Sequence, residues 1–111
     1  MRLQVKGRNV EVTPSVREYA ESKLAKLARQ LAPPTQVELE LSEEKNPSIS
    51  ASQVAEATIF TKGPTLRARE ASSDIRTSID QLVDNLERQV KRYHEKRHEE
   101  PRRRAEHHGA A

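Results

Sequence analysis

Residues 72–97, SSDIRTSIDQLVDNLERQVKRYHEKR, contain the pattern that decides the fold of this chain. Apolar residues recur there at intervals of three and four, which places them in one stripe along a helix. The stripe consists of Ile75, Ile79, Leu82, Leu86, Val90 and Tyr93. Ser73 or Asp74 can accept hydrogen bonds from the first free backbone N–H groups. The pattern therefore predicts a long amphipathic helix, and we expect Pro101 to stop it.

The charged residues of this helix are sorted to the two sides of its apolar stripe. The acidic set is Asp80, Asp84 and Glu87, and the basic set is Arg88, Arg92 and Lys96. The basic residues form an i, i+4, i+8 ladder, in which each like-charged pair weakens a helix by roughly 0.2–0.5 kcal/mol. Such a ladder suits a helix that lies along a polyanion. The alternative is a solvated charged face on a long terminal helix.

Composition limits the chain to one domain with a modest core. It has 111 residues, of which 33% are charged and 33% hydrophobic. The net charge of +3 and the pI of 9.4 permit a local basic face. The chain has no Cys, which excludes thiol chemistry and fits a reducing compartment. It has no apolar run near the roughly 18 residues that cross a bilayer, and no secretory signal, so we expect a cytoplasmic protein with no membrane partner.

The remaining sequence predicts four strands and a second helix. The expected strands are residues 2–6, 36–41, 53–61 and 66–69. Thr13 and Pro14 mark the start of a helix that runs to about Leu31, before Pro33-Pro34. The order β-α-β-β-β-α predicts an α+β fold with two layers, a four-stranded sheet with two helices packed on one face. On its bare face we expect cross-strand charge pairs among Arg2, Lys6, Glu38, Glu40, Arg67 and Arg69.

The aromatic residues are few, and their placement bears on any nucleic-acid partner. The register of the third strand is open, because Val54 and Phe60 favour burial on one face and Ile59 on the other. We expect all three rings, Tyr19, Phe60 and Tyr93, in the core. Contact with a nucleic acid would then run through phosphates, sugars and shape rather than base stacking.

The first helix also has a basic flank, which contains Lys23, Lys26 and Arg29. If the two helices pack side by side, this flank and the ladder of the second helix can border one groove or ridge. The alternative for each residue is that its alkyl chain covers the edge of the core. Residues 99–111, EEPRRRAEHHGAA, predict a disordered basic tail or the start of a linker.

Three motifs give the chain a family resemblance. They are GRNVEVT at residues 7–13, KLAKL at residues 23–27, and D-x-x-x-x-I-D-x-L-x-D-x-L-x-R-Q-x-x-x-Y at residues 74–93. With them the chain resembles the ribosome hibernation-promoting factor and ribosome-associated inhibitor family over roughly residues 1–97. The resemblance implies the same β-α-β-β-β-α fold and a ribosome-binding domain at residues 1–98. It also implies binding to the small ribosomal subunit in the decoding channel, at the A and P sites, where it would block messenger and transfer RNA and silence translation.

The resemblance assigns contact with ribosomal RNA to basic residues on both helices. By position these are Lys23, Lys26 and Arg29 on the first helix, and Arg88, Lys91, Arg92 and Lys96 on the second. Asp74, Ile79 and Asp80 match the family's helix start, where we expect capping and packing. The chain departs from the family at Arg76, usually an aromatic residue, and at Pro64, usually a second glycine of the hairpin.

Other kinds of chemistry find little support in the sequence. The three glycines form no phosphate-binding loop, so we expect no catalytic residues, no cofactor and no small-molecule substrate. His94 and His98 have a spacing that can hold two ligands of a metal, but no Cys or carboxylate cluster completes the site, and we expect none. The remaining alternative is a protein-interaction module, a modulator of a transcription factor, that docks through the charged second helix.

Overall fold

The computed structural model describes residues 2–31, 36–46 and 48–110, with side chains described as far as His94. Its elements are β1 (Arg2–Arg8), α1 (Pro14–Ala28), β2 (Gln36–Glu43), β3 (Gln53–Phe60), β4 (Thr65–Ser72) and α2 (Ile75–Ala110). This order confirms the predicted β-α-β-β-β-α succession and the α+β class.

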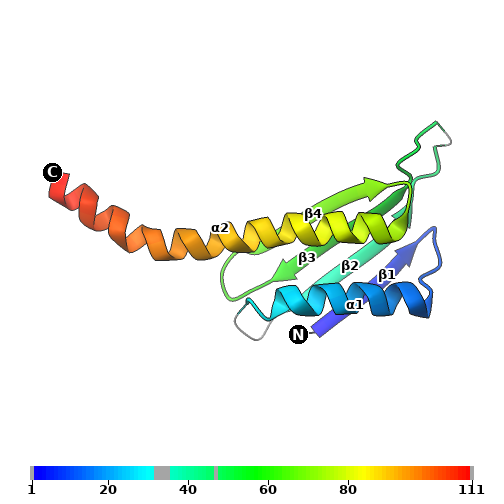
Figure 1. The fold of residues 1–111 in the computed structure, drawn as a ribbon, viewed down its shortest axis with the longest axis horizontal. Helices are drawn as coiled ribbons and strands as arrows, with labels where there is room; N and C mark the ends of the chain where they lie inside the picture. The colour runs from blue at the N-terminus through cyan, green and yellow to red at the C-terminus, as the bar shows by residue number, and fades with distance from the viewer. Residues whose placement is uncertain (1, 32–35, 47, 111) are drawn as a thin grey trace.

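The four strands form one sheet in the order β1-β2-β3-β4. β1 pairs in parallel with β2, and the later pairs are antiparallel, as a helical crossover followed by a meander requires. Figure 1 shows both helices on the same side of the sheet, with α2 over β3 and β4 and α1 beside it. The predicted two-layer arrangement is confirmed.

The register of β3 places Ile59 in the core and Phe60 outside it. Ile59 pairs with Val37 on β2 and Leu66 on β4, and this row of three apolar side chains is buried beneath the helices. Phe60 consequently faces outward, with 39% of its surface exposed. The expectation that all three rings lie in the core is wrong for Phe60, while Tyr19 and Tyr93 are half-buried.

The start of α1 follows the sequence signals closely. Asn9 adopts a positive φ of 60° in the turn after β1, a conformation that Asn tolerates better than most residues. Thr13 Oγ1 then accepts a hydrogen bond of 3.2 Å from the Val16 N–H. The helix ends earlier than predicted, at Ala28, because the next residues form tighter i→i+3 bonds such as Leu31 N–H to the Ala28 carbonyl.

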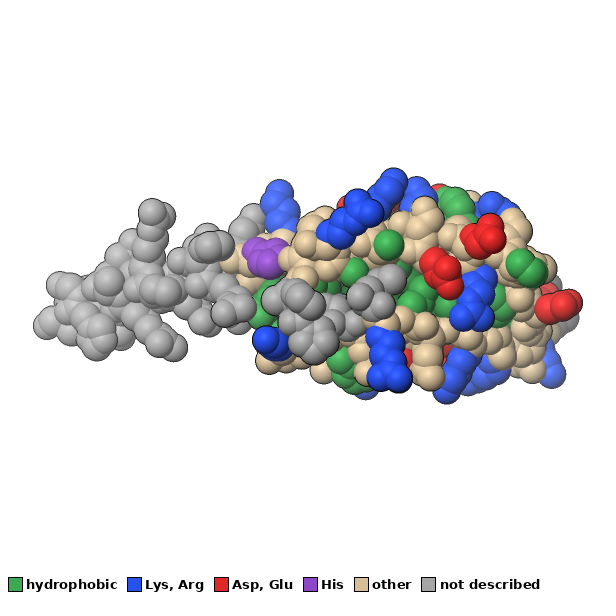
Figure 2. All heavy atoms as spheres, turned by 90° about the horizontal axis from the view of Figure 1, so that it is seen from below, with side chains coloured by type: hydrophobic (Ala, Val, Ile, Leu, Met, Phe, Trp, Pro, Cys, Tyr) green, Lys and Arg blue, Asp and Glu red, His purple; other side chains and the backbone are tan. Residues whose placement is uncertain are grey.

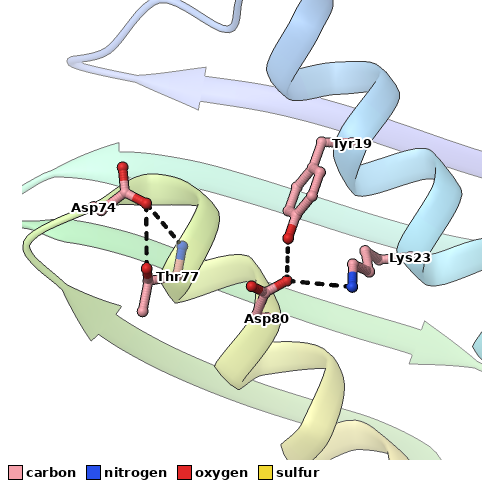
Figure 3. A network of polar contacts seen from close by, with 5 residues as sticks. All are labelled: Tyr19, Lys23, Asp74, Thr77 and Asp80. Atoms are coloured by element: carbon pink, nitrogen blue, oxygen red, sulfur yellow. Dashed lines mark hydrogen bonds and ion pairs between the residues drawn. The ribbon is translucent and has the colours of Figure 1, made fainter.

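The start of α2 is capped by Asp74, whose Oδ2 accepts from the Thr77 N–H at 3.2 Å (Figure 3). One turn on, the buried Ser78 hydroxyl donates to the Gln53 carbonyl at 2.6 Å and ties the helix to β3. The far end of the helix differs from the prediction, since α2 runs through Pro101 to Ala110 and projects beyond the sheet (Figure 1). A proline removes one backbone hydrogen bond and bends a helix, which need not end there.

Candidate nucleic-acid interface

The two helices run side by side in the same direction, and contacts at both ends fix this arrangement. Near their starts, Arg76 Nη2 donates to Ser15 Oγ at 2.5 Å. Near the end of α1, His94 Nε2 lies 2.7 Å from the Gln30 carbonyl oxygen. The C-terminal turn of α1 therefore lies beside the turn of α2 that contains His94.

Between these two contacts, Tyr19, Lys23 and Asp80 form a polar network that joins the helices (Figure 3). The Tyr19 hydroxyl donates to Asp80 Oδ1, and Lys23 Nζ lies 3.7 Å from the same oxygen. This hydrogen bond is the main cause that raises the pKa of Tyr19 above its ordinary value of 10.0; partial burial and the charge of Asp80 act in the same direction. Asp80 thus packs α2 against α1, and the buried Ile79 lies in the core, so both residues serve packing, as expected.

Lys23 and Arg76 both contact other side chains of the protein in this region. Lys23 is half-buried, with its ammonium 5.5 Å from the centre of the Tyr19 ring as well as near Asp80. Arg76, where the chain departs from the family, lies 5.2 Å from the same ring centre and bonds Ser15. RNA contact by Lys23 stays a prediction, and the structure gives its ammonium a partner on α2.

The other predicted cations come together at one end of the domain. Lys26 lies in the last turn of α1 and Arg29 directly after it, close to the Gln30–His94 contact. Arg88, Lys91 and Arg92 occupy the turns of α2 that lead to His94. We call this set the basic end; it consists of the exposed side chains Lys26, Arg29, Lys62, Arg88, Lys91 and Arg92. The side chain of Lys96 lies outside the described residues.

Lys62 is the member of the basic end that sequence reasoning missed. It lies in the connection between β3 and β4, and it lines one pocket together with Leu31 and His94. The residues around it, Lys62-Gly63-Pro64, predict an exposed turn. Its position near the end of α1 and the His94 turn of α2 depends on tertiary packing, which no local sequence signal reveals.

Acidic and basic side chains both lie at the opposite end, where the two helices begin. Figure 2 views the molecule from the α1 side and shows Asp and Glu toward the end at which α1 starts. Glu43 and Glu44 at the end of β2 and Asp74 before α2 are also exposed at that end. Exposed cations such as Arg17 and Arg76 lie there as well, so this end has charges of both signs.

The ladder of α2 does not face α1, so the two basic flanks do not border one groove. Asn85 donates to Glu70 of β4 at 3.0 Å, and Gln89 donates to the Arg67 carbonyl at 2.8 Å. Because Asn85 and Gln89 adjoin the ladder on the helix, the ladder lies on the outer and β4-facing side. The basic flanks meet at an end of the domain rather than along a shared cleft.

Charges on the outer face of the sheet are partly paired with one another. Arg69 Nε lies 3.8 Å from Glu56 Oε2 across β3 and β4, and Arg8 Nη1 lies 3.7 Å from Glu40 Oε1. All four side chains are well exposed, so each pair stabilises the fold by at most about 1 kcal/mol. Glu40 and Arg69 thus have the predicted cross-strand role. Their partners, Arg8 and Glu56, lie outside the predicted set. The pairs leave less free positive charge on this face.

The part of the chain that the structure describes shows neither a metal cluster nor a membrane-spanning helix. Among its residues, no group of three or more His, Cys, Asp and Glu is arranged to hold a metal ion, and His94 bonds the Gln30 carbonyl instead. The side chain of His98 lies outside this part of the chain. Within the same residues, no helix combines the length and apolar character needed to span a membrane.

Known proteins resemble the chain in sequence and in fold. Residues 3–98 match the family model described as Sigma 54 modulation protein / S30EA ribosomal protein. A ribosome hibernation promotion factor of Picosynechococcus sp. is 37% identical over 97 residues, which cover 86% of this chain and 50% of that protein. A ribosome hibernation promoting factor of Klebsiella oxytoca is 32% identical over 96 residues, which cover 86% of this chain and 96% of that protein.

A solved structure extends the likeness to three dimensions. The Thermus thermophilus Protein Y N-terminal domain matches with a TM-score of 0.73 at 34% identity, covering 84% of this chain and 99% of that one. The chain spans about half the length of the first curated relatives that it matches.

Proposed function

Because the chain belongs to the Sigma 54 modulation protein / S30EA ribosomal protein family, we propose that it acts as a ribosome hibernation factor. It binds the small ribosomal subunit at the decoding channel, contacts ribosomal RNA at the A and P sites, and blocks messenger and transfer RNA. The observation that carries this proposal is the basic end, where exposed cations from both helices and the β3–β4 connection gather on one rigid domain. Relatives named as ribosome hibernation factors support it.

Affinity in this account comes mainly from neutralised phosphates. Each Lys or Arg that contacts a phosphate releases condensed counterions, so binding weakens steeply as salt rises. With about six phosphate contacts, affinity is expected to fall on the order of a thousandfold between 50 and 200 mM salt.

The mechanism is occupancy, and it assigns no bond-making step to any residue. Hydrogen bonds between the helices, such as Tyr19 to Asp80, keep the two-layer body rigid enough to exclude RNA from the space it fills. Shape and neighbouring ribosomal proteins would supply the specificity that phosphate contacts lack. A role on ribosomes would place the protein in the cytoplasm, with no membrane partner and no small-molecule substrate.

A sucrose gradient tests the proposal most simply. The purified protein is mixed with small ribosomal subunits and sedimented at 50 and 200 mM salt. We expect it to migrate with the subunits at the lower salt and to be released at the higher. Sedimentation at the top of the gradient under both conditions would contradict the proposal.

The family description also names sigma 54 modulation, which favours a second candidate, a protein-interaction module that modulates a transcription factor. The exposed charges of α2 could then dock on a protein surface. Nuclease treatment separates the two candidates, because binding that survives digestion of RNA would favour a protein partner. Binding lost on digestion favours the ribosome.

A further inference from the structure

A pocket of about 430 Å³ opens at the basic end, where the β3–β4 connection meets the segment after α1 and the turn of α2 that contains His94. It is lined by Leu31, Thr61, Lys62, Gly63, Pro64, Tyr93 and His94. We call it the hairpin pocket. Its size falls within the range of small-ligand sites, and it combines apolar walls with a few polar groups, as such sites do.

Two adjacent rings form one wall of the hairpin pocket. The ring centroids of Tyr93 and His94 lie 5.7 Å apart with their planes tilted by 44°. The Tyr93 ring packs so closely on the β3–β4 connection that a Cβ added at Gly63 would lie 2.6 Å from its hydroxyl oxygen. A larger residue at this position would force the Tyr93 ring to shift, so glycine permits this close approach of backbone and ring.

Hydrogen bonds hold the other walls in place. Thr61 Oγ1 donates to the Pro64 carbonyl and accepts from the Gly63 N–H, both at 2.9 Å. His94 Nε2 must donate to the Gln30 carbonyl, because a carbonyl can only accept. The neutral imidazole then keeps Nδ1 as an acceptor. The pocket is thus pre-formed, and its groups include a cation, Lys62, and an imidazole of defined tautomer.

We propose that the hairpin pocket receives an unpaired nucleobase of the bound RNA, an inference that rests on the proposed function. Aromatic side chains stack on the face of any base, and single-stranded RNA is commonly bound through bases turned out in this way. Charge complementarity favours a nucleotide as occupant, because Lys62 lines the pocket and Arg29, Lys91 and Arg92 lie within about a turn of Gln30 or His94. The interface would then include one base contact besides its phosphate contacts.

A nuclear magnetic resonance titration tests the pocket itself. The full chain, labelled with ¹⁵N, is titrated separately with adenosine monophosphate, uridine monophosphate and ribose 5-phosphate. We expect saturable shifts of the amides of Thr61, Lys62 and His94 with both nucleotides, and much weaker shifts with the sugar phosphate. Equal shifts with all three probes would overturn the proposal, since the site would then bind only phosphate. Absence of shifts would overturn it too.

Variants separate stacking from general packing. Tyr93→Phe keeps the ring and is expected to bind the nucleotides as the wild type does, whereas Tyr93→Leu should weaken binding about tenfold. Phe60→Leu, which removes an exposed ring on the other face of the sheet, is the matched control and should change nothing. Should Tyr93→Leu fail to fold, His94→Ala replaces it with the same expectation. Nucleotide binding as tight as that of the wild type, by Tyr93→Leu or by this substitute, would contradict the proposal that these rings stack on the base.

Co-sedimentation with small subunits then distinguishes the two proposals. Failure of the wild-type protein to bind would overturn the proposed function and, with it, the base pocket. If the wild type binds, the pocket variant should bind about tenfold more weakly. Undiminished ribosome binding by that variant would leave the proposed function standing and overturn the pocket inference, whether or not free nucleotides bind.

Discussion

Tyr19 on α1 donates a hydrogen bond to Asp80 on α2, a residue 61 positions further along the chain. The same carboxylate lies 3.7 Å from Lys23 Nζ, so one side chain of α2 holds two side chains of α1. Because the two helices cover one sheet, this contact helps to set the direction in which they lie side by side. It thereby helps to bring the last turn of α1 and the basic turns of α2 before His94 to the same end of the domain.

Removal of the Tyr19 hydroxyl should therefore lower stability in a pH-dependent way. The raised pKa of Tyr19 means that the folded state favours its protonated form. This stabilisation is fully present below the unfolded pKa of 10.0 and is lost as the pH rises through the higher folded value. Urea denaturation should show Tyr19→Phe less stable than wild type at pH 7, with a gap that narrows above pH 10.

Arg17→Ala is the control for this comparison, because it breaks the exposed Arg17–Glu21 pair within α1 alone. That substitution should cost less than about 0.5 kcal/mol. A Tyr19→Phe protein as stable as wild type at pH 7 would show that the interhelical bond contributes nothing.

The cap of α2 should depend on Asp74 and not on its neighbour Ser73. Asp74 Oδ2 accepts from the Thr77 backbone N–H and from the Thr77 hydroxyl, both at 3.2 Å. Asp74→Ala is expected to lower the free energy of unfolding by about 1 kcal/mol, and Ser73→Ala by only a few tenths, roughly the scatter of surface substitutions. Equal losses in thermal denaturation would show that the cap is shared.

Two glycines should differ in their tolerance of a methyl group. A Cβ at Gly7 would lie 2.4 Å from the Val10 carbonyl oxygen, which belongs to the backbone and cannot move freely. A Cβ at Gly63 would meet the far end of the Tyr93 side chain at 2.6 Å. Gly7→Ala should therefore destabilise more than Gly63→Ala, whose cost is expected at about 1–3 kcal/mol. The reverse order in urea denaturation would contradict the geometry.

The cations of α1 should contribute unequally to ribosome binding. Lys26 is exposed at the basic end, whereas Lys23 is half-buried beside Asp80. If Lys26 neutralises a phosphate, Lys26→Ala should reduce the slope of log affinity against log salt by about 0.9. Lys23→Ala should leave that slope nearly unchanged. The comparison is made by co-sedimentation with small subunits from 50 to 200 mM salt. Equal slope changes for the two variants would show that Lys23 also neutralises a phosphate.

Local patterns in the sequence predicted the order of elements, the α1 cap and the core stripe of α2. Ile79 and Leu82, for example, are fully buried, because apolar residues three and four apart form one helix face that packs against the core. The register of β3 was not decided by its own sequence, because it depends on pairing of Ile59 with Val37 and Leu66 on other strands.

The site was harder to predict than the fold. The sequence pattern predicted both sets of cations. It assigned each set to the flank of a helix and did not reveal that the two sets lie at the same end of the domain. That end exists because contacts distant in sequence, such as His94 with Gln30, place the helices in parallel. Tertiary packing also places Lys62 close to Leu31 and His94 and pairs Lys23 with Asp80. Neither arrangement can be predicted from the residues next to Lys62 or Lys23 in the sequence. The helical course of α2 beyond Pro101 was likewise missed.

The central claim is that the basic end contacts the RNA of the small subunit. Co-sedimentation of the double variant Arg88→Glu/Arg92→Glu with small subunits at 50 mM salt tests it directly, since both side chains are exposed and their reversal should leave the fold intact. The matched control is Glu38→Lys/Glu40→Lys on the outer face of the sheet. We predict that the first variant no longer sediments with the subunits while the second binds as wild type does. Normal binding by Arg88→Glu/Arg92→Glu would contradict the claim.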